Sequence, residues 1–242
     1  MISDFGVTYR LQRKVVKVYF TSGIGADYRL FTHLRLPEGF DTSYIHWIAP
    51  LEDEKLPDYA FRLTQQIDTT QPFILVGLSL GGIMSVEMAK RISPLCTILI
   101  SSVPVSAHLP RFYKMAGNLG LGKWVPASFL KAATTVKHTL TMRPAANRQL
   151  MMAVIRAGDD RFIRWALNAV LNWNNTEIPQ PLYHLHGTRD EVFPINLTTP
   201  THTIRKGGHM FLLDRPDTVN RILGELLPPF ANTPSLRSPR PV

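Results

Sequence analysis

The 242-residue sequence predicts an α/β fold in which a mostly parallel sheet is flanked by helices. Short, nearly continuous apolar runs alternate with longer segments of helical periodicity, and most of these runs lead into a Gly, Ser or Pro. Continuous apolar runs are typical of strands buried on both faces of a parallel sheet. Parallel strands need crossover connections, which the helical segments between them can supply.

Six apolar runs are expected to be strands, and three segments between or after them are expected to be helices. The predicted strands are Val15–Thr21, Tyr44–Ala49, Phe73–Leu78, Cys96–Ile100, Leu182–Leu185 and Thr201–Arg205. The predicted helices are Asp58–Ile67, Leu80–Ile92 and Thr218–Leu227. Their alternation indicates right-handed crossovers within one sheet.

The alternation stops between residues 103 and 176, where the sequence is helical and amphipathic. We interpret this segment as a helical cap inserted into a single domain that spans residues 1–242. Its Met and Trp side chains are expected to form mostly the packing core of the cap. Residues 229–242 are rich in proline and have no periodicity, so they are expected to be a disordered tail.

The composition, 45% hydrophobic and 19% charged, is that of a globular protein and excludes a fibrous or disordered chain. No apolar stretch reaches the roughly 20 residues that a membrane helix needs. The first residues lack the basic and apolar regions of a signal peptide. The single cysteine, Cys96, lies in an apolar run and is expected to be buried. These observations predict a cytoplasmic protein.

The formal net charge of +9 is concentrated between residues 105 and 176, a segment that contains ten basic residues and only two acidic ones, Asp159 and Asp160. No run of five basic residues, zinc-ligand spacing or RNA-binding signature occurs, so nucleic acid is not an expected partner. A solvated surface and a site for an anionic ligand are both compatible with this charge. The ten residues are Arg111, Lys114, Lys123, Lys131, Lys137, Arg143, Arg148, Arg156, Arg161 and Arg164.

The pentapeptide at residues 77–81, GLSLG, is a G-x-S-x-G pattern that places Ser79 between a predicted strand and a predicted helix. This is the setting that a nucleophile elbow needs, and it favours a catalytic serine over an incidental glycine-rich turn. Gly77 and Gly81 are expected to leave room for neighbouring backbone, because side chains there would clash with it.

A serine hydroxyl is a weak nucleophile, so a base and an orienting acid must accompany it. Asp190 and His209 each follow a late predicted strand, in HGTRDEVFP and GGHMF, at the edge where open α/β sheets carry their sites. Asp190 is preferred over Glu191 because of its G-x-x-D spacing. The histidines of the preceding strand and its end, His184 and His186, are expected to be packed or structural.

These three motifs together resemble the α/β-hydrolase superfamily, and the resemblance extends from Val15 to Leu227. The chain order serine, acid, histidine is also that of the superfamily. The resemblance implies that Ser79 is the nucleophile, His209 the base and Asp190 the acid that orients the base.

The resemblance further implies an oxyanion hole formed by two backbone N–H groups. One would come from Leu80, directly after the nucleophile. The other would come from Ile24, in the loop after the first strand, where Gly23 allows the backbone to approach closely. Many members carry His-Gly in this loop, whereas this chain has Ser22 before the glycine. Backbone donors do not depend on that side chain, so a working hole is expected.

A narrower resemblance involves residues 22–36, SGIGADYRLFTHLRL, which together with the elbow and GGHMFLL are similar to type II thioesterases. Those enzymes remove acyl groups from carrier-protein or coenzyme A thioesters. Their usual elbow, G-H-S-M-G, is replaced here by GLSLG.

The sequence therefore predicts a serine hydrolase that cleaves a carboxylic ester or related acyl bond of a small molecule, without a metal ion or organic cofactor. The basic segment would suit an anionic ester or thioester. A thioesterase, a carbon–carbon bond hydrolase and an acyltransferase share the same residues, and a binding protein on this fold is a further alternative.

Overall fold

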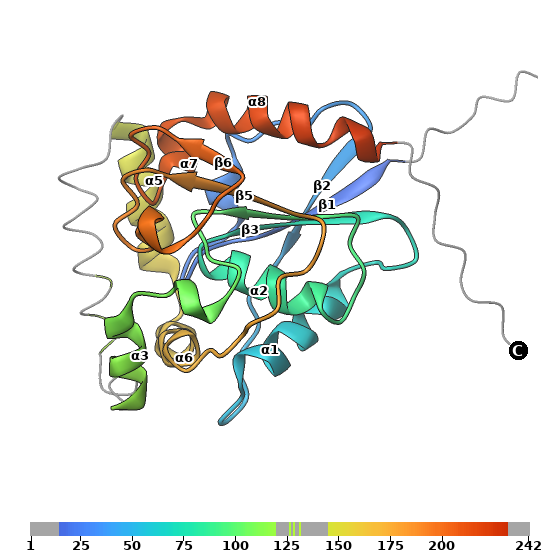
Figure 1. Cartoon of the computed structure of the whole chain (residues 1–242). Helices are drawn as coiled ribbons and strands as arrows, with labels where there is room; N and C mark the ends of the chain where they lie inside the picture. Colours follow the sequence, from blue (N-terminus) through green and yellow to red (C-terminus); the bar gives the residue numbers. More distant parts are fainter. Residues whose placement is uncertain (1–14, 120–125, 127, 129–130, 132–144, 232–242) are drawn as a thin grey trace, which may run out of the picture.

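The computed structural model describes residues 15–119, 126, 128, 131 and 145–231. Within this part, six parallel strands form one sheet in the order β2-β1-β3-β4-β5-β6 (Figure 1). The strands are β1 (Val16–Thr21), β2 (Phe40–Ile45), β3 (Phe73–Leu78), β4 (Thr97–Ile100), β5 (Leu182–Gly187) and β6 (His202–Ile204). The parallel sheet and its flanking helices confirm the predicted fold class.

Helices cover both faces of this sheet. Helix α8 lies over one face, and α1 and α2 lie over the other (Figure 1). Short 3-10 helices at Tyr28–Phe31 and Thr64–Gln66 follow β1 and α1. The α-helices are α1 (Leu56–Leu63), α2 (Leu80–Ala89), α3 (Arg111–Asn118), α5 (Ala145–Ala157), α6 (Asp160–Leu171), α7 (Phe211–Asp214) and α8 (Pro216–Leu226).

Strands β1 and β3 each contribute to two hydrophobic clusters, because successive side chains of a strand point to opposite faces of the sheet. In β1, Val18 and Phe20 belong to the cluster that includes α8, whereas Tyr19 belongs to the cluster that includes α1 and α2. In β3, Ile74 belongs to the cluster that includes α8, and Leu75 belongs to the cluster that includes α1 and α2. Burial on both faces explains why these strands are almost continuously apolar in sequence.

Five strands lie within two residues of their predicted bounds, but the second was misplaced. It was predicted at Tyr44–Ala49 and is formed by Phe40–Ile45. This strand lies at the edge of the sheet, where residues such as Asp41 are exposed, so its apolar signal is weak. The apolar residues after it belong to a loop, in which the Ile48 N–H and C=O pair with the Tyr59 hydroxyl at 3.0 and 2.8 Å.

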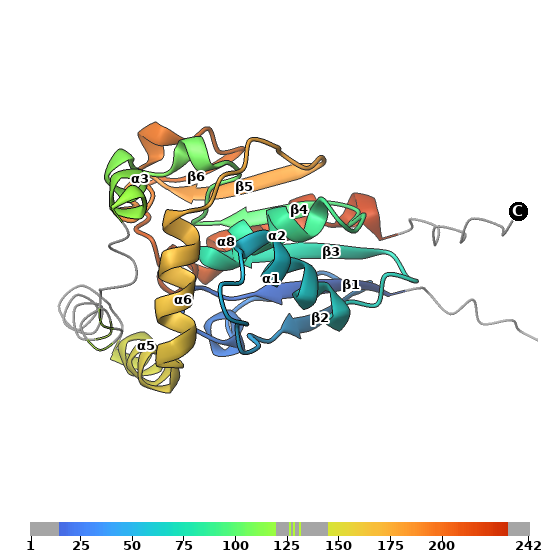
Figure 2. The same ribbon diagram turned by 90° about the horizontal axis from the view of Figure 1, so that it is seen from below.

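Helices α3, α5 and α6 lie between β4 and β5, in the segment interpreted as a cap. Figure 2 shows α6 running across the end of the sheet beside α5. Much of the remaining segment, including the basic residues Lys123, Lys137 and Arg143, lies outside the described residues. The first two residues of the predicted tail, 229 and 230, belong to a 3-10 helix at Pro228–Phe230, and residues 232–242 lie outside the described residues.

None of the described helices combines the length and apolarity needed to cross a membrane. Cys96 is buried, and this burial raises the pKa of its thiol to about 12. The thiol is therefore neutral at physiological pH and packs as a small apolar group.

Candidate active site

Ser79 occupies a strained turn between β3 and α2, with φ 54° and ψ −119°. A non-glycine residue with positive φ is uncommon and needs support from its surroundings. Two hydrogen bonds supply that support: the Ser79 N–H donates to the Ile100 carbonyl at 2.9 Å, and the Ser102 hydroxyl donates to the Ser79 carbonyl at 2.7 Å. The turn leaves Ser79 9% exposed at the end of the sheet.

The glycines around Ser79 are required by contacts between backbone segments. A Cβ atom at Gly77 would collide with the backbone of Gly81, and one at Gly81 would collide with the carbonyl of Thr21 in β1. Glycine at these positions therefore lets α2 begin directly against the ends of β1 and β3.

His209 lies between β6 and α7 and contacts both of the other residues of the predicted triad. Its Nε2 is 3.0 Å from the Ser79 Oγ, and its Nδ1 is 2.9 and 3.0 Å from the two Asp190 carboxylate oxygens. In the neutral tautomer whose Nδ1–H donates to Asp190, Nε2 can accept the hydroxyl proton of Ser79. The structure thus brings Ser79, His209 and Asp190 together in the order that acid–base activation of a serine needs.

Asp190 is buried, but its carboxylate accepts several hydrogen bonds. Besides His209, the backbone N–H groups of Val192 and Phe193 each donate to its Oδ1 at 2.9 Å. Burial alone would raise the pKa of this carboxyl, but the hydrogen bond and charge of His209 and the Phe193 N–H outweigh it and lower the pKa below its usual value. The neighbouring Glu191 is exposed, and its Oε2 accepts the backbone N–H of His209 at 3.4 Å.

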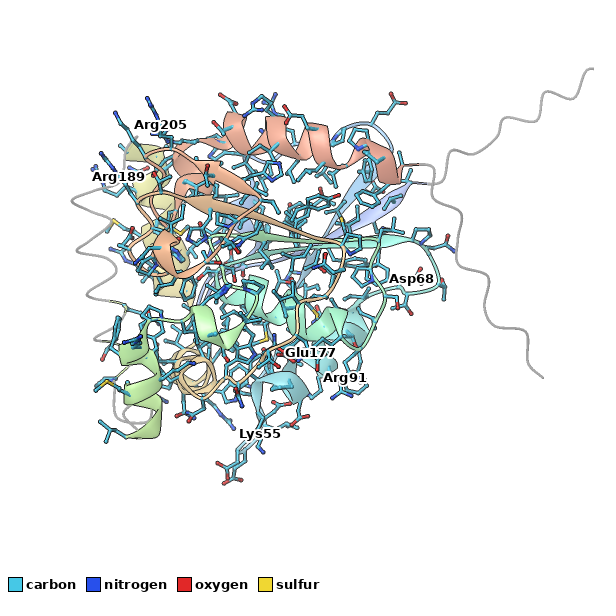
Figure 3. All side chains as sticks on the ribbon, in the orientation of Figure 1. Lys55, Asp68, Arg91, Glu177, Arg189 and Arg205 are labelled. Atoms are coloured by element: carbon cyan, nitrogen blue, oxygen red, sulfur yellow. The ribbon has the colours of Figure 1, made fainter. Side chains whose placement is uncertain are left out.

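Two arginines of the neighbouring turns have their side chains at the surface (Figure 3). Arg189 directly precedes Asp190, and Arg205 begins the turn after β6, yet both are exposed. Figure 3 shows their side chains at the outer corner of the molecule beside β6. The ionised state of Asp190 therefore depends on its hydrogen bonds and on His209 rather than on an arginine partner.

Two buried histidines support the loop that carries Asp190. The His186 Nε2 is 2.7 Å from the Phe193 carbonyl and 3.5 Å from the Asp190 Oδ2, so it carries a proton and donates. Its Nδ1 then accepts from the His184 Nε2 at 2.9 Å. Burial lowers the pKa of both rings, that of His184 to about 3. Sequence reasoning treated both only as packed or structural; their position in H-x-H-G, just before the acid, was the available signal.

The predicted oxyanion donors lie beside the serine. A Cβ atom at Gly23 would be 3.5 Å from the Ser79 Cβ, so the loop after β1 passes directly alongside the elbow. Leu80 is the first residue of α2, and Ile24 lines the same cavity as Ser79 and His209. No backbone acceptor among the described residues pairs with the N–H of Leu80 or Ile24.

A cavity of about 260 Å³ opens next to Ser79 and His209, and its walls are mainly apolar. The ammonium of Lys131, which belongs to this wall, contacts Asp160 at 2.5 Å and the Gly158 carbonyl at 2.6 Å. Its charge is therefore largely offset. The apolar residues of the wall are Ile24, Ala26, Leu30, Leu78, Met151, Val154, Ile155, Ile163, Leu167, Val192 and Met210.

No group of three or more His, Cys, Asp or Glu side chains within the described ranges is arranged to hold a metal ion. Among the described residues that line the cavity, the polar side chains are those of Ser79, His209 and Lys131.

Comparison with solved structures shows the same fold at 16% sequence identity. A thermophilic esterase from Thermogutta terrifontis superposes with a TM-score of 0.61, covering 90% of this chain and 91% of that chain. MenH from S. aureus superposes with a TM-score of 0.64, covering 88% of this chain and 93% of that chain. ClbQ from the colibactin NRPS/PKS pathway superposes with a TM-score of 0.56, covering 87% of this chain and 96% of that chain.

Comparison by sequence gives one family. No curated protein matches the chain. The model of the alpha/beta hydrolase family matches residues 27–222, which include the elbow, the acid loop and the histidine loop. On this match and on its parallel sheet, the chain belongs to the alpha/beta hydrolase family.

Proposed function

We propose that the protein is a serine hydrolase that cleaves a carboxylic ester or a related acyl bond of a small molecule. The observation that carries this proposal is the continuous contact from Ser79 through His209 to Asp190, with 3.0 Å at the serine and 2.9 Å at the acid. The first distance is within the hydrogen-bond reach that a general base needs, and the second is within the reach that an orienting acid needs.

In the proposed reaction, the Ser79 Oγ attacks the carbonyl carbon while its proton passes to the His209 Nε2. The N–H groups of Leu80 and Ile24 stabilise the negative oxygen of the tetrahedral intermediate. His209 then protonates the leaving group, and an acyl-enzyme forms. Water, deprotonated by His209, hydrolyses this intermediate, while Asp190 holds the ring and stabilises its cation. These groups supply all the proposed steps without a metal ion or organic cofactor.

The apolar cavity supports an apolar acyl group as the part of the substrate held next to the serine. Much of its wall comes from α5 and α6, through Met151, Val154, Ile155, Ile163 and Leu167. We therefore retain, as part of this proposal, the interpretation of residues 103–176 as a cap that shapes the substrate pocket.

Labelling with a fluorophosphonate probe and hydrolysis of p-nitrophenyl esters from acetate to long acyl chains test the proposal. Wild-type protein should be labelled at Ser79 and should hydrolyse at least one ester, whereas Ser79→Ala should lose labelling and about 10³-fold or more in kcat. Ser85→Ala is the control, because Ser85 is a buried serine of α2 whose hydroxyl donates to the Gly81 carbonyl. Equal labelling of the Ser79→Ala variant, or a wild type that neither labels nor turns over, would overturn the proposal. The second result would favour a binding protein.

A thioester is the second candidate substrate. It is favoured by the similarity of residues 22–36 to type II thioesterases and by the fold shared with ClbQ, a protein of an NRPS/PKS pathway. Values of kcat/KM for acyl-coenzyme A and p-nitrophenyl esters of the same acyl chain separate the two. A preference for the thioester by tenfold or more, about 1.4 kcal/mol of transition-state binding, would assign the thioesterase function.

A further inference from the structure

We propose that Trp47 is a positioning residue of the oxyanion hole, which it ties to helix α6. The proposal rests on the proposed function, since it takes the N–H of Ile24 as an oxyanion donor. The segment concerned, residues 22–26, is called the oxyanion loop below.

The oxyanion loop is a tight turn, and two side chains donate hydrogen bonds to the same carbonyl oxygen in it. The Ala26 N–H donates to the Gly23 carbonyl at 3.1 Å, and Gly25 has a φ of 64°. The Ala26 carbonyl accepts the Ser22 hydroxyl at 2.6 Å and the Trp47 Nε1–H at 2.8 Å. A carbonyl oxygen has two lone pairs, so these two donors satisfy it fully. Ser22 donates from within the loop, whereas Trp47 donates from outside it.

The ring of Trp47 is in turn held by α6. Its centroid lies 4.8 Å from that of Phe162, with an angle of 31° between the rings, and 6.4 Å from that of Tyr59. Phe162 is buried in the first turn of α6. Trp47 therefore connects the oxyanion loop to α6 through one hydrogen bond and one aromatic contact.

The turn before α6 also packs directly on the oxyanion loop. A Cβ atom at Gly158 would lie 2.6 Å from the Gly25 carbonyl oxygen, and one at Gly25 would lie 2.8 Å from the Ile163 Cδ1. The loop is thus confined between α6 on one side and Ser79 on the other. A shift of α6 or of Trp47 would move the backbone that carries the Ile24 N–H.

Such a shift should affect the transition state more than the bound substrate. The oxyanion forms only during the reaction, and a misplaced donor stabilises it less. Loss of the Trp47 hydrogen bond should therefore lower kcat and leave KM nearly unchanged. A residue with a purely structural role would lower stability without this separation.

The test compares Trp47→Phe with Trp165→Phe. The first keeps an aromatic ring against Phe162 but removes the donor to Ala26. Trp165 belongs to the same aromatic cluster, 4.2 Å from Tyr59, and its Nε1 also donates to a backbone carbonyl, that of Glu54 at 2.8 Å, which is outside the oxyanion loop. We expect Trp47→Phe to lower kcat roughly tenfold with KM within about twofold, less than the ~10²-fold loss of a whole donor. Trp165→Phe should leave kcat within about twofold.

A second measurement does not depend on turnover. Amide hydrogen exchange in a peptide covering residues 22–26 should be faster in Trp47→Phe than in wild type, and unchanged in Trp165→Phe. Ser22→Ala should also accelerate this exchange, because it removes the other donor to Ala26.

Each outcome decides one of the two proposals. If wild type is active and the two tryptophan variants have equal kcat, the positioning role of Trp47 is overturned. If wild type is neither labelled by the fluorophosphonate nor able to hydrolyse any ester or thioester, the proposed function fails, and the exchange measurement alone decides whether Trp47 holds the loop. Unchanged amide exchange of residues 22–26 in Trp47→Phe would overturn the proposal that Trp47 holds the oxyanion loop.

Discussion

Asp190 shows how a buried carboxyl can stay ionised. It receives hydrogen bonds from the His209 ring and from two backbone N–H groups, and these lower its pKa although burial acts in the opposite direction. The ionised carboxylate accepts only, so it selects the His209 tautomer with a proton on Nδ1. That tautomer leaves Nε2 free to accept the proton of Ser79.

Replacing Asp190 with Asn should disable the site without removing its shape. The amide nitrogen would face the His209 Nδ1 and favour the tautomer protonated at Nε2, which cannot accept a proton from Ser79. We expect kcat to fall by about 10³- to 10⁴-fold with little change in KM. Steady-state kinetics on the best ester found for the wild type would measure this.

Glu191→Gln is the matched control for that variant, because an amide oxygen can still accept the backbone N–H of His209. Its kcat should stay within about threefold of wild type. An Asp190→Asn variant that keeps more than about a tenth of the wild-type kcat would contradict the role proposed for Asp190.

Sequence reasoning found some residues of the site and missed others for an identifiable reason. Ser79, Asp190 and His209 carry local signatures: a pentapeptide, a spacing after a strand, and a chain order. Trp47 has none, since its acceptor, Ala26, lies 21 residues away and becomes its neighbour only when β2 and the following loop are placed. A contact of that kind leaves no periodic pattern in the sequence.

At the scale of elements, the unit formed by β3 and α2 depends on backbone contacts. Helix α2 begins so close to the ends of β1 and β3 that Gly77 and Gly81 face backbone atoms of neighbouring segments. Backbone cannot move aside as a flexible side chain can, so a methyl group at either position must displace an element.

Gly81→Ala should therefore lower the free energy of unfolding by about 3 kcal/mol, at the upper end of the usual cost of overpacking. Gly224→Ala is the opposite case: Gly224 is exposed in α8, and a Cβ atom there would meet nothing within 4 Å. Because alanine favours a helix over glycine, this variant should gain about 0.5–1 kcal/mol. Denaturant unfolding of both variants measures the two changes. A Gly81→Ala variant as stable as wild type would show that β1 and α2 can separate.

The strands were predicted well where both faces are buried and less well at the edge. The inner strands β1, β3 and β4 are apolar on both sides, which a run of apolar residues reveals directly. Strand β2 has exposed positions such as Asp41 and Thr42, and the apolar residues that follow it pack in a loop. The boundary between this strand and its loop depends on which residues pair with β1, and that is a tertiary property.

At the scale of the whole molecule, the buried histidines couple folding to pH. His184 is 1% exposed and His186 is fully buried, and burial lowers the pKa of both. His184 titrates near pH 3 in the folded state and near pH 6.5 when unfolded. Between these values the unfolded chain binds a proton that the folded chain does not, so stability rises with pH across this window.

The free energy of unfolding should thus be nearly constant between about pH 7 and 8 and should fall as the pH is lowered from 6.5 toward 4. His184 alone contributes a slope of about 1.4 kcal/mol per pH unit, to which His186 adds in the same direction. The lowered pKa of Asp190 also removes stability at low pH, as this carboxyl becomes protonated. Denaturant titrations at half-unit pH intervals would measure the slope.

His184→Asn is the variant that isolates one of these contributions. It should reduce the slope between pH 6 and 4.5 by about 1.4 kcal/mol per pH unit, which is the contribution of one proton, whatever its effect on stability at pH 7. An unchanged slope would mean that His184 is not the group responsible.

Sequence patterns alone predicted the fold class, most of the inner strands and the three residues that the structure brings together at the end of the sheet. It could do so because burial on two faces, a strained Gly-rich turn and a fixed chain order each leave a local pattern. Tertiary packing was needed to establish the bounds of β2, the volume and walls of the cavity, the pairing of His184 with His186 and the contact between Trp47 and the oxyanion loop. These depend on distances between segments far apart in the chain and on exclusion of water, neither of which has a sequence period.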